Sequence, residues 1–197
     1  MADTSQNPRR VYRLLPALGE FRILFLDEAL TKILPWQRSG RPEDLPEEFT
    51  GEWNGDPALR VTEFPSAARD APVLGRRIAD ALHEELVSAG RLVPLRTDDP
   101  DSGEFFLYAV EAVVDCLDTR RSSKPKKSTG QIKQAVFRPE ALRYDVPAFR
   151  VPEWSRAVYW NGWAVDRLRE LLGDDLEARL VWSEDPGLTP HPDPMGF

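Results

Sequence analysis

The sequence predicts an α+β protein with a mixed or mostly antiparallel sheet and two principal helices. Two segments, residues 75–89 and 162–172, carry apolar residues at helical spacing, and each is followed by a glycine. Several other short runs are apolar, or alternate polar with apolar residues as strands do. With 197 residues, of which 41% are apolar, the chain can bury a substantial core. A single domain over residues 11–183 is therefore expected.

The first half of the chain has few segments of clear type. Residues 11–15 and 60–64 are strand candidates, whereas the apolar run at 21–26 is too short to be assigned to helix or strand. Residues 35–57 hold many prolines, glycines and acidic side chains, which predicts an irregular surface segment. The helix at 75–89 is expected to lead directly into a short strand.

The second half contains the longest apolar run, residues 105–117, which predicts a central strand buried on both faces. Residues 131–137 alternate, so a hairpin between these two strands is the simplest pairing. Asn161 is placed to cap the second helix. Three further short strands are expected at 148–151, 157–160 and 176–182.

Both ends of the chain are predicted to be flexible. Residues 1–10 are polar, and residues 184–197 contain four prolines. The N-terminus has no apolar region typical of a signal peptide, and no apolar run approaches the roughly 20 residues of a bilayer span. A single cysteine excludes an intramolecular disulfide and fits a reducing compartment. A cytoplasmic location without membrane association is expected.

The charge is unevenly distributed along the chain. The formal net charge is −7, which argues against broad nucleic-acid binding. Residues 41–120 carry −10, whereas residues 121–160 carry +6. The basic loop at 120–133 keeps an RNA-associated protein open as an alternative, although the loop contains no aromatic residue for base stacking.

Cys116 is the residue with the most evident reactive chemistry, but its surroundings do not favour catalysis. A nucleophilic thiol needs a lowered pKa, and the adjacent carboxylates Asp115 and Asp118 would raise it. One cysteine and two distant histidines cannot form a zinc site. We therefore predict no catalytic residue and no metal site. A small enzyme with an unassigned carboxylate site remains the alternative.

Four residues are predicted to bind a partner protein. Trp53 lies in the segment 35–57, which is rich in acidic residues, and is either an interface anchor or a residue that fixes a long loop to the core. The acidic turn with Asp98, Asp99 and Asp101 lacks the spacing of a calcium loop and would attract a basic partner. The sequence makes no prediction of the oligomeric state.

The C-terminal part of the chain resembles a bacterial family. The residues that carry the resemblance are Val114-Asp115-Cys116-Leu117-Asp118, Arg121-Ser122, Phe137-Arg138-Pro139-Glu140, Phe149-Arg150-Val151-Pro152-Glu153 and Val158-Tyr159. In this order they are similar to the immunity proteins of polymorphic toxin systems, specifically immunity-protein family eleven, formerly a domain of unknown function. The similarity spans about residues 60–182.

This resemblance implies a non-catalytic intracellular protein that neutralises a cognate toxin domain by occlusion. It therefore also implies that the protein has no enzymatic activity and no cofactor. It also implies that Asp115, Cys116, Asp118 and Arg150 are determinants of the fold rather than a binding site. A charge near the end of a sheet needs a partner if it is partly buried. We therefore expect Arg150 to form an ion pair with Asp115 or Asp118.

Overall fold

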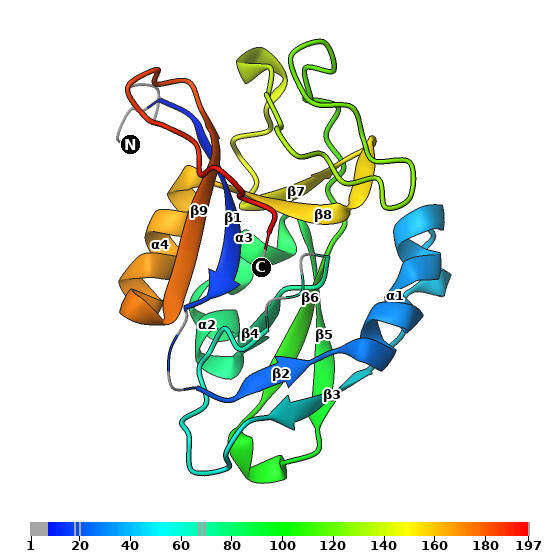
Figure 1. The fold of residues 1–197 in the computed structure, drawn as a ribbon. Helices are drawn as coiled ribbons and strands as arrows, with labels where there is room; N and C mark the ends of the chain where they lie inside the picture. Colours follow the sequence, from blue (N-terminus) through cyan, green and yellow to red (C-terminus); the bar gives the residue numbers. More distant parts are fainter. Residues whose placement is uncertain (1–7, 18, 20, 67, 69, 197) are drawn as a thin grey trace.

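The computed structural model describes residues 8–17, 19, 21–66, 68 and 70–196. It contains helices and two sheets, one wholly antiparallel and one mixed, so the predicted α+β class is confirmed. Figure 1 shows the two sheets at opposite ends of the molecule, with helices packed against each of them. The described part of the predicted flexible N-terminus begins at residue 8, and residues 1–7 lie outside the described residues.

The antiparallel sheet joins the two ends of the chain. Its strands, in spatial order, are β7 (Ala148–Val151), β8 (Trp154–Asn161), β1 (Arg10–Pro16) and β9 (Leu176–Ser183). Helix α4 (Gly162–Leu172) packs against one face through an apolar stripe that includes Val165 and Leu168. Asn161 does not cap this helix with its side chain as predicted. Its amide instead donates to the carbonyls of Arg143 and Val146.

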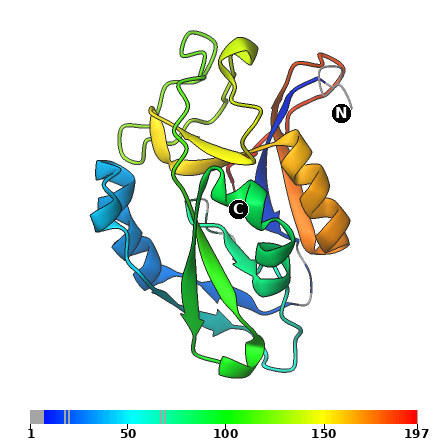
Figure 2. The same cartoon turned by 180° about the vertical axis from the view of Figure 1, so that it is seen from behind.

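The mixed sheet is built from the middle of the chain. Its strands, in spatial order, are β2 (Ile23–Phe25), β3 (Phe49–Asn54), β5 (Gly90–Thr97), β6 (Phe105–Val110) and β4 (Val73–Gly75). Only the β3–β5 pair is parallel. Strands β2 and β3 lie in front of β5 and β6 in Figure 1 and behind them in Figure 2, so the sheet is strongly curved.

The segment predicted to be irregular, residues 35–57, is instead partly regular. It contains the end of helix α1 (Asp27–Ser39), from Pro35 onwards, and the whole of β3. Pro35 lies inside α1, where the composition argued against a helix. Packing outweighs this local penalty, because Ala29, Ile33 and Trp36 line one helix face and are buried in the core beneath the mixed sheet. The strand predicted at 60–64 is reduced to one bridge between Phe21 and Arg60.

The predicted helix at 75–89 forms two shorter helices, α2 (Arg76–Ala81) and α3 (His83–Val87), separated at Leu82. The chain then enters β5 at Gly90, which crosses β6 very closely. A Cβ atom on Gly90 would lie 2.3 Å from the carbonyl oxygen of Ala109. Only glycine therefore permits this approach. Gly90, which was predicted to end the helix, also allows β5 and β6 to pack closely.

The long strand predicted at 105–117 ends at Val110. Within β6 the prediction of burial on both faces is confirmed, because Leu107 and Tyr108 point to opposite faces and both are fully buried. The backbone N–H groups of residues 111 and 112 still donate to the carbonyl of Ala89, and beyond them the chain leaves the sheet. The predicted hairpin with residues 131–137 is reduced to one bridge between Leu117 and Phe137.

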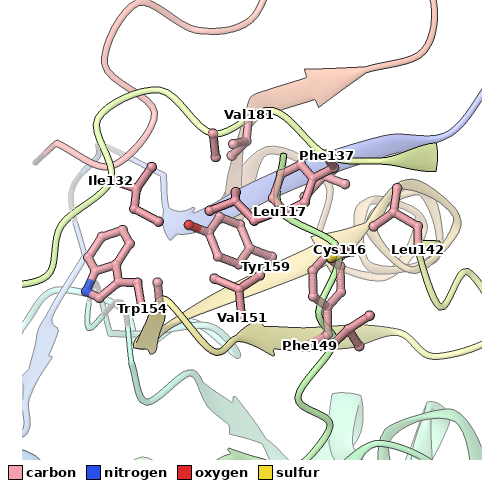
Figure 3. Close-up of a cluster of buried hydrophobic side chains, with 14 of the residues drawn as sticks. Cys116, Leu117, Ile132, Phe137, Leu142, Phe149, Val151, Trp154, Tyr159 and Val181 are labelled. Atoms are coloured by element: carbon pink, nitrogen blue, oxygen red, sulfur yellow. The ribbon is translucent and has the colours of Figure 1, made fainter. Parts of the chain in front are cut away.

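Residues 111–147 fold over the face of the antiparallel sheet opposite to α4. Their apolar side chains form a cluster with β7, β8 and β9, which we call the loop cluster (Figure 3). Within it, Phe137 lies edge-on to the rings of Phe149, Tyr159 and Trp182. An irregular segment of this length is thereby held by burial of aromatic side chains rather than by a strand ladder.

The tail predicted to be flexible, residues 184–197, makes defined contacts with β9. The backbone N–H of His191 donates to the carbonyl of Leu180 at 2.8 Å, and Arg179 donates to the carbonyl of Gly196 at 2.9 Å. Met195 is buried in the loop cluster. Within the described residues, none of the helices has the length and hydropathy that crossing a bilayer requires.

Candidate functional site

The four residues predicted to bind a partner come together at one end of the mixed sheet. Trp53 lies on β3, and Asp98, Asp99 and Asp101 lie in the turn between β5 and β6, which includes the 3-10 helix η2 (Pro100–Ser102). The carboxylate of Asp98 accepts the backbone N–H of Trp53 at 2.9 Å, next to the parallel β3–β5 ladder. We call this group, together with Arg22 and Ser102, the acidic corner.

Within the acidic corner, Trp53 is held by three different contacts. Its indole N–H donates to Ser102 Oγ at 2.9 Å, and its ring packs edge-on against Phe105 with centroids 5.4 Å apart. The guanidinium of Arg22 lies 5.1 Å from the ring centroid and also donates to Asp99. These contacts favour the second of the two predicted roles for Trp53, in which the residue fixes a loop to the core.

The carboxylates of the acidic corner differ in whether they are free to interact with a partner. The hydrogen bond from Arg22 lowers the pKa of Asp99, which favours the ionised carboxylate that pairs with Arg22. Asp98 and Asp101 are both exposed. Within the described residues, neither forms an ion pair with Lys, Arg or His. The outward negative charge of the turn therefore comes from Asp98 and Asp101.

The contacts of Trp53 lead to a stability prediction. Trp53→Ala should lower the free energy of unfolding by about 2 kcal/mol or more, because a half-buried indole and its hydrogen bond are removed. Ser102→Ala, which removes only the hydrogen-bond acceptor, should cost about 1 kcal/mol. Urea unfolding of both variants measures the difference. Unchanged stability of Trp53→Ala would return the residue to the role of interface anchor.

Next to the acidic corner, the outer face of β2 and β3 carries side chains that the sequence did not single out. Ile23 and Phe25 are 42% and 49% exposed, whereas Leu24 between them is buried. Phe25 is paired with Glu52 and Ile23 with Asn54, so these four side chains share one face. We call Ile23 and Phe25 the β2–β3 patch. The sequence does not reveal this patch, because in the apolar run at 21–26 the outward-facing Ile23 and Phe25 are as apolar as the inward-facing Leu24.

Polar groups surround the β2–β3 patch. Glu28 at the start of α1 accepts from Thr50 Oγ1 at 3.1 Å and pairs with Lys32 at 2.7 Å. Glu52 and Asn54 on β3 are exposed. An apolar centre with a polar, mainly acidic border is typical of protein-binding surfaces.

A shallow depression of about 460 Å³ lies on the other side of the acidic turn, over β5 and β6. The charged side chains that line it are paired with one another, Arg76 with Glu104 and Arg96 with Glu48. Figure 2 shows β5 and β6 from this side. The pairing makes this surface electrically balanced, in contrast to the outward carboxylates of the acidic corner.

The expected ion pair of Arg150 is wrong. Asp115 pairs with Arg138 at 2.8 Å, and the carboxylate of Asp118 accepts the backbone N–H groups at 120 and 121. Arg150 is only 3% exposed; it lies 4.5 Å from the ring centroid of Trp36 and donates to the carbonyl of Ser155. Its burial lowers the pKa of the guanidinium to about 10.

The alternation of β7 explains this correction. Phe149 faces the loop cluster, to which Cys116 also belongs. Successive side chains of a strand point to opposite faces, so Arg150 is directed away from the cluster and towards α1. Sequence proximity within a motif did not predict which face of the sheet each residue would occupy.

Cys116 is fully buried in the loop cluster (Figure 3). Desolvation by burial and the charge of Glu153 raise the pKa of its thiol to about 12. The direction agrees with the prediction, although desolvation rather than Asp115 is its main cause. No group of three or more His, Cys, Asp or Glu side chains gathers into a metal-binding arrangement in the described part of the chain.

The geometry defines a two-sheet α+β protein that carries an apolar patch and an acidic corner side by side on one sheet. Comparison of the chain with protein-family models and with curated proteins finds no significant match. The resemblance to the immunity proteins therefore stays a prediction.

Proposed function

We propose that this protein is a non-catalytic binding protein of the immunity type, which neutralises a cognate bacterial toxin domain by covering it. The observation that carries the proposal is the β2–β3 patch, where Ile23 and Phe25 present nearly half of their surfaces to solvent on adjacent outward positions. Exposed aromatic and aliphatic side chains next to one another are typical anchors of protein interfaces.

The electrostatics of the neighbouring carboxylates support the same function. Asp98, Asp101 and Glu52 place negative charge beside the patch, which would accelerate association with a basic target. Where a pKa shift is resolved for a described carboxylate, as for Asp99 and Glu28, its direction is downward. Ionised carboxylates suit electrostatic attraction better than proton donation, so these shifts favour binding over the alternative of acid catalysis.

The proposal places the protein in the cytoplasm of the cell that makes the toxin. This location agrees with the free thiol of Cys116, since unpaired cysteines persist in reducing compartments. The partner would be the toxin domain encoded beside the gene for this protein, and covering a surface of that domain requires no cofactor.

The test compares two alanine variants with matched exposure. Phe25→Ala should weaken binding to the toxin domain of the neighbouring gene about 30-fold, as expected for the loss of a central anchor worth about 2 kcal/mol. Val87→Ala removes an apolar side chain of similar exposure, 47%, from α3 and should leave affinity unchanged. Calorimetric titration measures both affinities.

The possible failures are distinct. Equal affinities of the two variants and the unchanged protein would reject the β2–β3 patch as the interface. Failure of the unchanged protein to bind the toxin domain, or to protect cells that express it, would reject the proposed function itself.

A further inference from the structure

The loop of residues 120–133 is a second charged region, unrelated to the acidic corner. We call it the basic loop; it contains six cationic residues and no acidic one: Arg120, Arg121, Lys124, Lys126, Lys127 and Lys133. Figure 1 places it at the end of the molecule opposite to the turn between β5 and β6. The protein therefore presents opposite charges at its two ends.

In the part of the chain that the structure describes, the cations of the basic loop lack the carboxylate partners that most other Lys and Arg residues have. Within the described residues, fourteen Lys and Arg residues lie within ion-pair distance of a carboxylate, and none of the fourteen belongs to the basic loop. Lys126 donates to the side-chain amide oxygen of Gln131, a neutral group. The positive charge of the loop is consequently available to an external anion.

Hydrogen bonds hold the basic loop in a defined shape. The N–H of Ser123 donates to the carbonyl of Gln134, whose own N–H donates back to Ser123 Oγ at 3.0 Å. Nearer the tip, Lys126 donates its N–H to the carbonyl of Gln131 and accepts the N–H of Gly130. Mutually repelling cations are thus held together on an ordered scaffold, which lowers the entropy lost when an anion binds.

A recess of about 430 Å³ lies between the basic loop and the tail. Ser123, Lys133 and Gln134 line it on the loop side, and His191 with three tail prolines lines it on the other. The ammonium group of Lys133 and the side-chain amide of Gln134 are hydrogen-bond donors of the kind that carboxylates accept. The recess therefore joins positive charge to a concave surface.

The distribution of charge indicates the size of the anion. The whole chain carries −7 and the basic loop +6, so the rest of the chain carries −13. Salt screening confines the attraction of the loop cations to roughly 8–10 Å. A long polyanion such as duplex RNA would extend beyond this range and be repelled by the negative charge of the rest of the chain. The basic loop also has no aromatic side chain on which a nucleic-acid base could stack.

From these observations we infer that the basic loop is a docking site for a short acidic peptide segment, whose carboxylates bind the loop cations and the rim of the recess. The site lies away from the β2–β3 patch and does not depend on the proposed function. The charge complementarity predicts weak, salt-sensitive binding that is fast to form.

The experiment uses the full chain and a fluorescein-labelled octaglutamate peptide, followed by fluorescence anisotropy at about 50 mM salt. The loop variant replaces Arg120, Arg121, Lys124 and Lys127 by alanine. The control variant replaces Lys32, Arg38, Arg91 and Arg167 by alanine, which changes the net charge by the same amount at exposed positions elsewhere. Circular dichroism verifies that both variants are folded.

The expected result is at least about tenfold weaker peptide binding for the loop variant, with the control variant close to the unchanged protein. Raising the salt to about 200 mM should weaken binding by the unchanged protein. Absence of peptide binding by the unchanged protein, or an equal loss of peptide affinity in the loop and control variants, would overturn the inference. Tighter binding of a 16-base-pair RNA duplex than of the peptide would also overturn it and assign the loop to nucleic acid.

Discussion

Phe137→Ala is expected to lower the free energy of unfolding by about 3–5 kcal/mol, the largest effect on stability that we predict for a single substitution. Phe137 is almost fully buried, and its ring makes edge contacts with Phe149, Tyr159 and Trp182 at centroid distances of 5.3 to 5.9 Å. Few strand bonds hold the segment 111–147, so these contacts join it to the antiparallel sheet. Urea-induced unfolding followed by tryptophan fluorescence measures the change.

Two controls make this prediction specific. Phe137→Leu keeps most of the buried volume and should cost about 1.5 kcal/mol or less. Phe25→Ala removes the same side chain from a half-exposed position and should change stability by about 0.5 kcal/mol or less. If Phe137→Ala were no more destabilising than Phe25→Ala, the loop cluster would not be what holds residues 111–147.

The thiol of Cys116 should react with a disulfide reagent at least about 1,000-fold more slowly in the folded than in the unfolded protein. Its pKa is raised from 9.0 to about 12, which reduces the thiolate fraction at neutral pH, and its complete burial blocks the reagent. Reaction with 5,5′-dithiobis(2-nitrobenzoate), with and without denaturant, measures the ratio. Rapid reaction of the folded protein would revive a chemical role for this cysteine.

The same shift has a consequence for stability at alkaline pH. Between about pH 9 and pH 12 the unfolded thiol loses its proton while the folded thiol keeps it. The unfolded state then binds fewer protons than the folded state, so the stability falls as pH rises through this range. Burial also raises the pKa of Tyr108 and Tyr159, which adds to the fall. Cys116→Ala should make the fall shallower, and an unchanged slope would contradict the assignment.

The parts of the fold that follow local rules were predictable from the sequence. Helix α4 has a regular apolar stripe and ends before Gly173, so its bounds were predicted correctly. Helix α1 was missed because Pro35 and the prolines, glycines and acidic residues that follow it together predicted an irregular segment. Its stability comes from burial of Ile33 and Trp36 against distant strands, which no local rule detects.

The candidate site shows the same division. Trp53 and the acidic turn were predicted separately as partner-binding residues, and the β3–β5 pairing brings them together. Ile23 and Phe25 were not distinguishable from core residues in a uniformly apolar run. Their exposure depends on which face of β2 packs inward, and that choice is made by the tertiary structure.

The sequence by itself determined the α+β class, strands β1, β5, β7, β8 and β9, the second helix and the segregation of charge, because composition and periodicity act over neighbouring residues. Only the tertiary structure decided that there are two sheets, that Arg150 faces Trp36 rather than a carboxylate, and that Phe25 faces solvent. The physical reason is that strand partners and buried faces are selected by contacts between residues far apart in the chain.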